Sequence, residues 1–369
     1  MDSLKGADLA KKCERLAALH PQSNTDAGLR ARALRAADGN PRLLEWLDKV
    51  LEAGGVDTDA LLAAMEQAET RFRENVLTKA LLEQLDEAAR ELLARLLVYE
   101  LPVPKEAVAA VCEDEVALDE TLRRTVALGL LERIEMDGEP HYRVPRLLAE
   151  VLPERITEEL AGRAAMVLYR VWWKEAEESQ EEQWLEIIRL GLIGSEHDIA
   201  TEMTSYVSAS WLDENRYRDS VKLCSEVLEV ADDFRVRGNR GLAFMVLGSM
   251  DAAMKDCQAA FTACPISDLI SSTSIRLNIA RSNAIQGRLD IALQQYQELL
   301  EFNESLKDHT ITASVLLGIA RIHAGQGRLN EALGLYQDAL KRQEILGDIK
   351  GKAVTLHEIG EIHVQRFLC

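Results

Sequence analysis

The residues of this sequence that most resemble a metal site are two histidines and two glutamates in the segment His357–His363. A zinc site on one helix needs histidines four residues apart, because that spacing puts both imidazoles on one face. These histidines are six residues apart, which separates them by about 120° around a helix. The six cysteines are scattered and include no Cys-x-x-Cys pair, which excludes a zinc or disulfide framework. We therefore expect no metal ligands.

One string, residues 347–353 (GDIKGKA), approaches a phosphate-binding loop. The motif G-x-x-x-x-G-K-[ST] needs four residues between its glycines and a hydroxyl after its lysine. This segment has one residue too few between its glycines, and Ala353 stands where the motif needs a hydroxyl. No G-x-S-x-G nucleophile motif is present, and Cys257 and Cys264 occupy packing positions expected of buried thiols. We therefore predict a non-enzymatic chain with no catalytic residues and no cofactor.

The strongest pattern in the sequence is a repeat of 40 residues, within which Arg281 and Arg321 occupy the same position. The repeated segments are Ile279–Arg281 with Ile319–Arg321, Gly287–Leu293 with Gly327–Leu333, and Tyr296 with Tyr336. Weaker copies lie at 215–221 and 248–254, and a third copy of the first helix lies at 356–363.

Each unit has a helix, a glycine-centred turn and a second helix. Ala320 and Ala332 would let the two helices approach closely, and Tyr336 would fill the gap to the next unit. The pattern resembles the tetratricopeptide repeat in a 40-residue form, over about 201–369. The resemblance implies a curved inner surface formed by eight residues, namely Ser274, Leu277, Arg281, Ser314, Leu317, Arg321, His357 and Glu361. Among them Arg281 and Arg321 are the candidate carboxylate contacts; the alternative is that both are solvated surface residues.

The last repeat is incomplete, because the sequence stops within its first helix. We expect that helix, Lys352–Phe367, to leave Val354, Ile359, Ile362 and Phe367 without a covering helix. An uncovered apolar patch of this kind recruits a partner or self-associates.

The segments before the repeats have different patterns. Residues 1–82 look entirely helical, with a helix at 27–37 that ends at Asp38-Gly39-Asn40 and another that begins at Pro41. Residues 83–153 predict three helices and then a β-hairpin formed by 131–135 and 141–144, which is the winged-helix arrangement. The hairpin is the only β structure expected. Residues 154–200 predict a helical linker whose acidic stretch, 175–187, forms a solvated helix face.

This order of segments resembles the C-terminal part of STAND-class signalling NTPases, the bacterial relatives of NACHT and NB-ARC proteins. The residues that resemble the family are Ala37–Leu44, similar to its G-x-P segment, and Tyr142–Leu148 in the winged helix. The resemblance implies that Gly39 and Pro41 lie near the adenine of a nucleotide. Pro145 stands where the family commonly has a phosphate-sensing histidine.

The net charge and the hydropathy of the sequence argue against a nucleic-acid-binding protein and a membrane protein. With 43 Lys and Arg against 62 Asp and Glu, the net charge of −19 repels phosphate backbones, so a nucleic-acid partner is disfavoured. No window approaches 18 consecutive apolar residues, and the first residues lack a signal-peptide core. Scattered cysteines favour a reducing compartment. We therefore expect a cytoplasmic protein without a membrane partner.

The predicted fold class is mostly α: a lid-like helical bundle (1–82), a winged-helix domain (83–153), a helical linker (154–200) and a tetratricopeptide-like α-solenoid (201–369). The preferred function is a non-enzymatic regulatory or sensor segment of a STAND-type signalling protein that binds a protein or peptide through its repeats. By resemblance, such proteins act in bacterial signalling and antiviral defence beside a nucleotide-binding or effector module. The alternatives are a winged-helix transcriptional regulator with a tetratricopeptide sensor and a plain scaffold.

Overall fold

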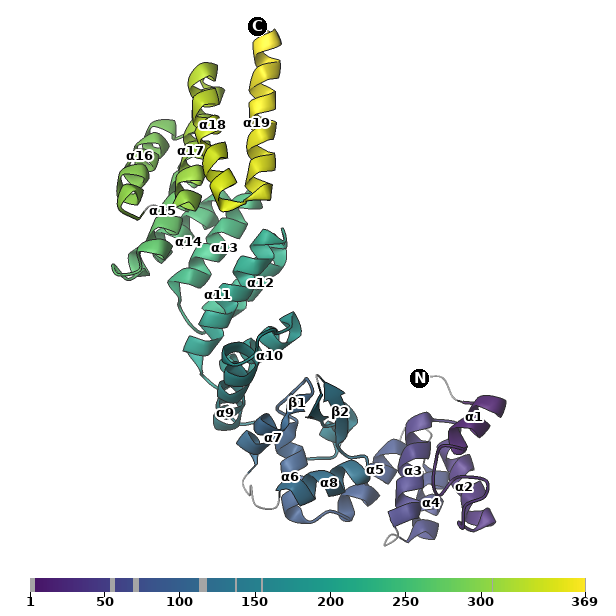
Figure 1. Ribbon diagram of the computed structural model, residues 1–369. Coiled ribbons are helices and arrows are strands. Elements are labelled where there is room, and N and C mark those ends of the chain that lie inside the picture. The colour runs from purple at the N-terminus through teal and green to yellow at the C-terminus, as the bar shows by residue number, and fades with distance from the viewer. Residues whose placement is uncertain are drawn as a thin grey trace. The chain divides into compact units, whose positions relative to one another are not determined.

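The computed structural model of the protein describes residues 4–53, 57–68, 73–112, 118–136, 138–153, 155–306 and 308–368. The chain divides into two compact units, Met1–Ile199 and Ala200–Cys369. Helices form most of both units, as the sequence predicts (Figure 1). Across these ranges no helix combines the length and the apolar character that crossing a membrane requires.

The first unit begins with helices whose buried side chains are mainly leucine and alanine. They are α1 (Gly6–Cys13), α2 (Ala27–Ala37), α3 (Pro41–Ala53), α4 (Thr58–Gln67) and α5 (Arg73–Glu83). The turn after α2 lies where the sequence predicts it, because Asp38 and Gly39 have φ angles of 47° and 72° and Pro41 begins α3. The side chain of Asn40 caps α3 by accepting the backbone N–H of Arg42 at 3.0 Å.

A small antiparallel sheet follows, and it has a strand that the sequence did not predict. The elements are α6 (Glu87–Leu96), β1 (Val103–Pro104), α7 (Lys105–Val111), α8 (Leu118–Ala127), β2 (Glu132–Met136) and β3 (Glu139–Arg143). The predicted hairpin is confirmed, because β2 pairs with β3 in an antiparallel register. The sheet is larger than predicted, since the strand order is β1–β3–β2 and Val103 pairs with Tyr142. Two residues are too few for an alternating pattern to reveal a strand. The centre of the predicted hairpin turn, residue 137, lies outside the described residues.

The last part of the first unit consists of a 3-10 helix, η2 (Arg146–Glu150), α9 (Glu158–Leu168), a π-helix, η3 (Tyr169–Lys174), and α10 (Glu181–Ile193). The prediction of a solvated acidic helix over 175–187 is wrong in two respects. The helix begins only at Glu181, and the side chain of Glu186 is buried. Glu186 accepts hydrogen bonds from Arg189 at 2.8 Å and from the backbone N–H of Glu100 at 2.7 Å, which compensates for the burial of its charge.

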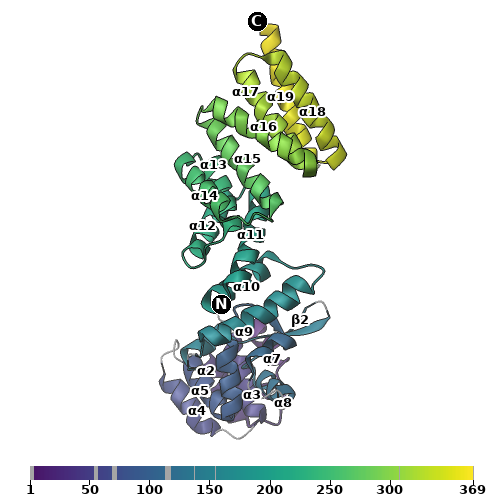
Figure 2. The ribbon, with the colours of Figure 1, turned by 90° about the vertical axis from the view of Figure 1, so that its left-hand side faces the viewer.

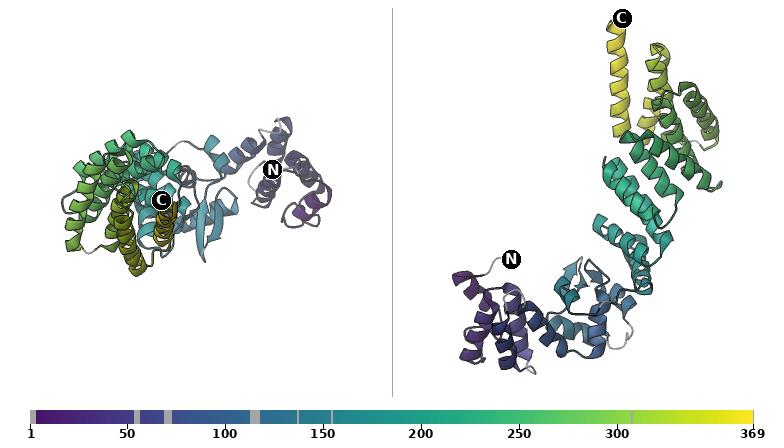
Figure 3. Two further views of the ribbon diagram at one scale, coloured as in Figure 1. Left: turned by 90° about the horizontal axis from the view of Figure 1, so that it is seen from above. Right: turned by 180° about the vertical axis from the view of Figure 1, so that it is seen from behind.

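The second unit is a succession of antiparallel helix pairs, visible from α13 onward in Figure 2 and from two further directions in Figure 3. The helices are α11 (His197–Asp213, which begins at the end of the first unit), α12 (Tyr217–Leu228), α13 (Phe234–Val246), α14 (Met250–Ala263), α15 (Leu269–Ile285), α16 (Leu289–Leu306), α17 (His309–Gly325), α18 (Leu329–Leu346) and α19 (Ile349–Leu368). Gly248, Gly287 and Gly327 turn the chain within successive pairs with φ angles of 82°, 77° and 76°.

The C-terminal helix is packed more completely than its sequence suggests. Ile362 is 2% exposed and forms a core cluster with Ala320, Ala332 and Tyr336, and Ile359 packs against that cluster. The expectation that both isoleucines lack a cover is therefore wrong, since α19 turns them toward α17 and α18. Val354 is 45% exposed, as expected for the outer face. The side chain of Phe367 lies outside the described residues.

Candidate functional site

A groove of about 620 Å³ lies among four helices of the second unit, and we call it the repeat groove. Its lining is mainly apolar, with two arginines, a serine and a tyrosine as the polar side chains. The lining residues are Leu242, Met245 and Val246 from α13, Arg281, Ala284 and Ile285 from α15, Leu289 and Tyr296 from α16, and Ser314, Leu317, Gly318, Arg321, Ile322 and Gly325 from α17.

Four of the eight predicted inner-surface residues line the repeat groove: Arg281, Ser314, Leu317 and Arg321. The other four lie elsewhere. Ser274 is exposed outside the groove, and Leu277 is only 5% exposed because it belongs to the core. On α19, His357 and Glu361 are exposed and face each other at 3.7 Å between Nε2 and Oε1.

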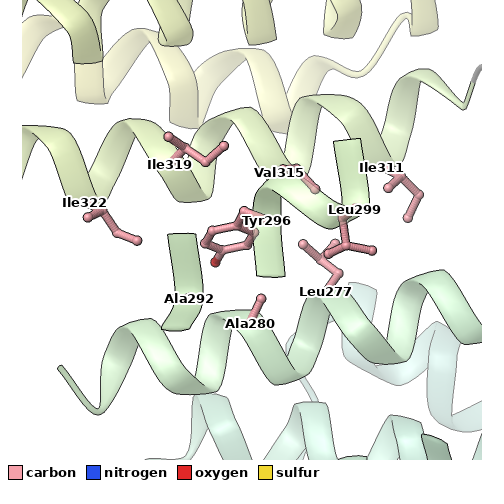
Figure 4. Packing of buried hydrophobic residues seen from close by; sticks show 9 residues of the cluster. All are labelled: Leu277, Ala280, Ala292, Tyr296, Leu299, Ile311, Val315, Ile319 and Ile322. Carbon is pink, nitrogen blue, oxygen red and sulfur yellow. The ribbon is translucent and has the colours of Figure 1, made fainter. Parts of the chain in front are cut away.

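The floor of the groove rests on a continuous core cluster, shown in Figure 4. Tyr296 lies at its centre, between the helix that contributes Leu277 and Ala280 and the helix that contributes Val315 and Ile319. Its ring is 1% exposed. The sequence singled out Tyr296 as a packing residue, and the structure adds that the ring also lines the groove.

Arg281 lacks a carboxylate partner among the described residues, because no hydrogen bond or ion pair joins it to any of them. It is partly buried. Burial lowers the pKa of its guanidinium and the nearby charge of Arg321 lowers it further, whereas Tyr296 opposes these effects. The groove therefore contains two neighbouring cations, and the described part of the chain provides no anion for the more buried one.

Arg321 has such an anion, because its Nε donates to Oε1 of Glu358 at 2.8 Å. The hydroxyl of Tyr336 donates to the other oxygen of the same carboxylate at 3.0 Å. Burial and the carboxylate of Glu358 together raise the pKa of Tyr336. Sequence reasoning chose Glu361 and missed Glu358, which lies on the face of α19 that packs against α17 and α18.

Gly318 is a second lining residue that sequence reasoning missed. A Cβ atom at this position would lie 2.4 Å from Cζ and 2.6 Å from the hydroxyl oxygen of Tyr296. The tyrosine ring therefore occupies the space of a side chain at 318. The sequence does mark this position as different between repeats. Positions 278, 318 and 358 are equivalent at the 40-residue spacing, yet they hold three different residue types, Asn278, Gly318 and Glu358.

A second groove, of about 440 Å³, lies in the first unit between α3 and the region of α8 and β2. Its lining residues are Arg42, Glu45, Trp46, Lys49, Val126, Gly129, Leu131, Glu132, Arg133, Ile134 and Pro145. Trp46 and Lys49 close one side by donating to the carbonyl oxygens of Gly129 at 3.1 Å and Val126 at 3.2 Å. Burial lowers the pKa of Lys49.

The two predicted nucleotide-adjacent residues lie just before and at the start of α3, the helix that contributes Arg42, Trp46 and Lys49 to this second groove. Gly39 is buried in the turn before α3, and Pro41 is partly buried at the start of that helix. Neither lines the groove directly, but Arg42, the next residue, does so together with Pro145. Among the residues that the structure describes, no group of three His, Cys, Asp or Glu side chains is arranged so that it could hold a metal ion.

Residues 271–345 match the tetratricopeptide repeat family. No curated protein sequence matches the chain. Among solved structures, a Pyrococcus horikoshii protein described as a Signal Transduction ATPase with Numerous Domains (STAND) protein with a tetratricopeptide repeat sensor matches with a TM-score of 0.54 and 15% identity. The match covers 99% of this chain and 58% of that one. The chain thus spans little more than half the length of this structural relative.

Two further structures match more weakly. YrrB, described as a tetratricopeptide repeat protein with an unusual peptide-binding site, gives a TM-score of 0.35 at 16% identity over 58% of this chain and 95% of that one. The apo form of Bacillus thuringiensis PlcR gives 0.38 at 15% identity over 55% and 90%. No inference about this chain rests on these two matches. The P. horikoshii match and the repeat family together show that the chain has a mostly helical fold that includes a tetratricopeptide-like solenoid.

Proposed function

We propose that this chain is a non-enzymatic sensor segment that binds a protein or peptide partner in the repeat groove. The observation on which this rests is the composition of the groove, in which apolar side chains from α13, α15 and α17 surround Arg281, a cation without a described carboxylate partner. An apolar cavity with a few polar groups is the usual form of a ligand site. Stacked helix pairs commonly present such concave surfaces to partners.

A substitution that fills the groove tests this proposal. Ser314→Trp places an indole in the groove, and Ser274→Trp is a matched control because Ser274 lies 40 residues earlier on the exposed face of α15. Peptides selected on the full chain by phage display should bind the Ser314→Trp variant at least tenfold more weakly and the control unchanged. Failure to select any peptide, or equal binding to both variants, would contradict the proposal.

For the first unit we propose a winged helix and a lid-like bundle that contact a nucleotide-binding module of a STAND-type signalling assembly. Support comes from the P. horikoshii fold match and from the second groove, which is lined by Pro145 and by Arg42, the residue after Pro41. Gly39 and Pro41 would then lie on the side that faces the nucleotide. The described cysteines form no disulfide bond with one another, which agrees with a cytoplasmic location. A role in antiviral defence is part of this proposal by family resemblance.

Co-expression with the neighbouring genes of the native genome tests the contact with a nucleotide-binding module. A protein with a phosphate-binding loop should co-purify with the chain. Arg42→Glu should reduce its recovery, because Arg42 lines the second groove, whereas Arg170→Glu on η3 should not. If no such protein co-purifies, or if both variants recover it equally, a plain scaffold is the better description.

A further inference from the structure

The last two repeats contain a carboxylate site that the chain fills by itself. In it, Arg321 and Tyr336 hold opposite oxygens of the Glu358 carboxylate, at 2.8 and 3.0 Å. Both donors point at one acceptor group, so the arrangement satisfies the carboxylate by charge and by hydrogen bonds. It shows how an arginine and a tyrosine of this repeat bind a carboxylate that a neighbouring helix presents.

Forty residues earlier, the same two donor types recur without the acceptor. Arg281 and Tyr296 are the equivalents of Arg321 and Tyr336, and Gly318 is the equivalent of Glu358. All three line the repeat groove. Gly318 has no side chain, and Arg281 makes no ion pair with any other residue in the described ranges. The earlier repeat therefore has the donors of a carboxylate site but no carboxylate of its own.

The surroundings of these donors favour an incoming anion. Arg281 is partly buried, and the charge of Arg321 lies close enough to lower the pKa of its guanidinium. A guanidinium that is partly buried beside apolar side chains such as Met245 and Ile285 is costly without an anion. Arg321 has the carboxylate of Glu358, and a carboxylate from outside the chain would do the same for Arg281.

We propose that Arg281 and the hydroxyl of Tyr296 bind a carboxylate of the partner, in the role that Glu358 has in the following repeat. This inference rests on the proposed function of the repeat groove and specifies the chemistry of its ligand. The adjacent apolar lining, from Leu242 to Ile285, requires that the partner present a large apolar group next to the carboxylate. A C-terminal leucine has both groups on one residue, and a glutamate beside a leucine has them on two.

Small probes of each kind test the carboxylate site on the full chain. The probes are N-acetyl-leucine, the dipeptide N-acetyl-Leu-Glu-amide, and N-acetyl-leucinamide, which lacks a carboxylate. The readout is the NMR signal of the 13C-labelled methyl group of Met245, a groove residue, which reports binding without any activity. The two acids should give saturable shifts, and the amide should bind at least tenfold more weakly. Whichever acid binds more tightly identifies the source of the carboxylate.

Substitutions of Arg281 and Tyr296 test whether these two donors bind the acids. Arg281→Gln should weaken binding of the acids about tenfold and Tyr296→Phe about threefold. Arg276→Gln is the matched control, because Arg276 lies on the same helix but outside the groove, over the ring of Phe261. Circular dichroism verifies that each variant is folded, and Arg281→Gln alone decides the question if Tyr296→Phe unfolds.

Equal binding of acid and amide, or binding unchanged by Arg281→Gln, would overturn the inference. Absence of any shift with both acids would overturn it as well. These failures differ from failure of the proposed function, because peptides selected by display would still lose affinity for the Ser314→Trp variant.

Discussion

Arg281 and Arg321 occupy equivalent positions in successive repeats, and they differ in burial and in partner. Arg321 pairs with Glu358 across to α19, whereas the position equivalent to Glu358 in the preceding repeat is Gly318. This one difference between the repeats leaves Arg281 without an ion pair to any residue that the structure describes. The proposed carboxylate site is therefore defined by a residue that differs between repeats and not by one that recurs.

We expect Glu358→Gln to lower the free energy of unfolding by about 1 kcal/mol, because it removes the charge shared by Arg321 and Tyr336. The value is small since Arg321 is 54% exposed and solvent screens the pair. Glu361→Gln, three residues further on the exposed face, is the control and should change nothing. Urea denaturation of both variants measures the difference; equal stability would contradict the assigned contacts.

The buried thiols should be chemically inert in the folded protein. Burial raises the pKa of Cys224 to about 11 and that of Cys257 to about 12. Because the thiolate is the nucleophile, a raised pKa leaves both side chains protonated at pH 8 and unreactive. Iodoacetamide at pH 8, followed by peptide mass spectrometry, should label the partly exposed Cys112 and Cys264 in native protein, and all four only in urea. Native labelling of Cys257 would refute its burial.

At the level of helices, close approach in the first unit depends on a pair of glycines. A Cβ atom on Gly194, at the end of α10, would lie 2.2 Å from the backbone nitrogen of Gly162 in α9. Backbone atoms cannot rotate away as a side chain can, so the two helices pack in this way only with glycine at position 194. No pattern in the sequence distinguishes Gly162 or Gly194 from other glycines.

Gly194→Ala should therefore destabilise the protein by about 2–3 kcal/mol, through overpacking. Gly334→Ala, within α18, has nothing within 4 Å of its added Cβ and should stabilise by about 0.5–1 kcal/mol through helix propensity. Thermal unfolding followed by circular dichroism compares the two. A neutral Gly194→Ala would mean that α9 and α10 are further apart than described.

The C-terminal helix α19 has one buried and one exposed position at which truncation to alanine should differ in its cost to stability. Ile362→Ala should cost about 2–4 kcal/mol because the side chain fills a core cluster with Tyr336. Val364→Ala, on the exposed face of α19, should cost less than about 0.5 kcal/mol because Val364 is 59% exposed. Denaturant titration provides both values, and similar costs at the two sites would show that α19 is not docked.

On the scale of the whole chain, the charge of −19 governs which large partners can approach. This charge opposes the approach of nucleic acid. Of the two arginines of α8, Arg124 pairs with Asp86 at 3.1 Å, and Arg123 donates to the backbone carbonyl oxygen of Asp119 at 3.2 Å. An arginine that is already paired with a carboxylate has little attraction for phosphates.

We therefore expect no retardation of duplex DNA by up to about 10 µM protein at 50 mM salt in an electrophoretic mobility assay. Proteins that bind DNA without sequence preference rely on uncompensated Lys and Arg, and their affinity is strongest at low salt. Sequence-selective retardation below 1 µM would favour the transcriptional regulator instead.

The sequence by itself determined the mostly helical fold class, the turns within the repeats and the 40-residue repeat. These depend on local rules: Pro41 begins a helix, and Gly287 and Gly327 take positive φ angles. The resemblance to the tetratricopeptide repeat implied that Arg281 and Arg321 lie on the inner surface, and both line the repeat groove.

The tertiary structure decided what each residue touches. The repeat groove brings α13, α15, α16 and α17 together, and its residues Leu242 and Met245 were not among those that the sequence analysis predicted. Glu358 and not Glu361 meets Arg321, since three residues turn a helix by about 300° and so change the face presented. The two-residue strand β1 and the buried charge of Glu186 likewise exist only through partners distant in sequence. Contacts of this kind follow from how helices pack against each other, and a local pattern does not contain that information.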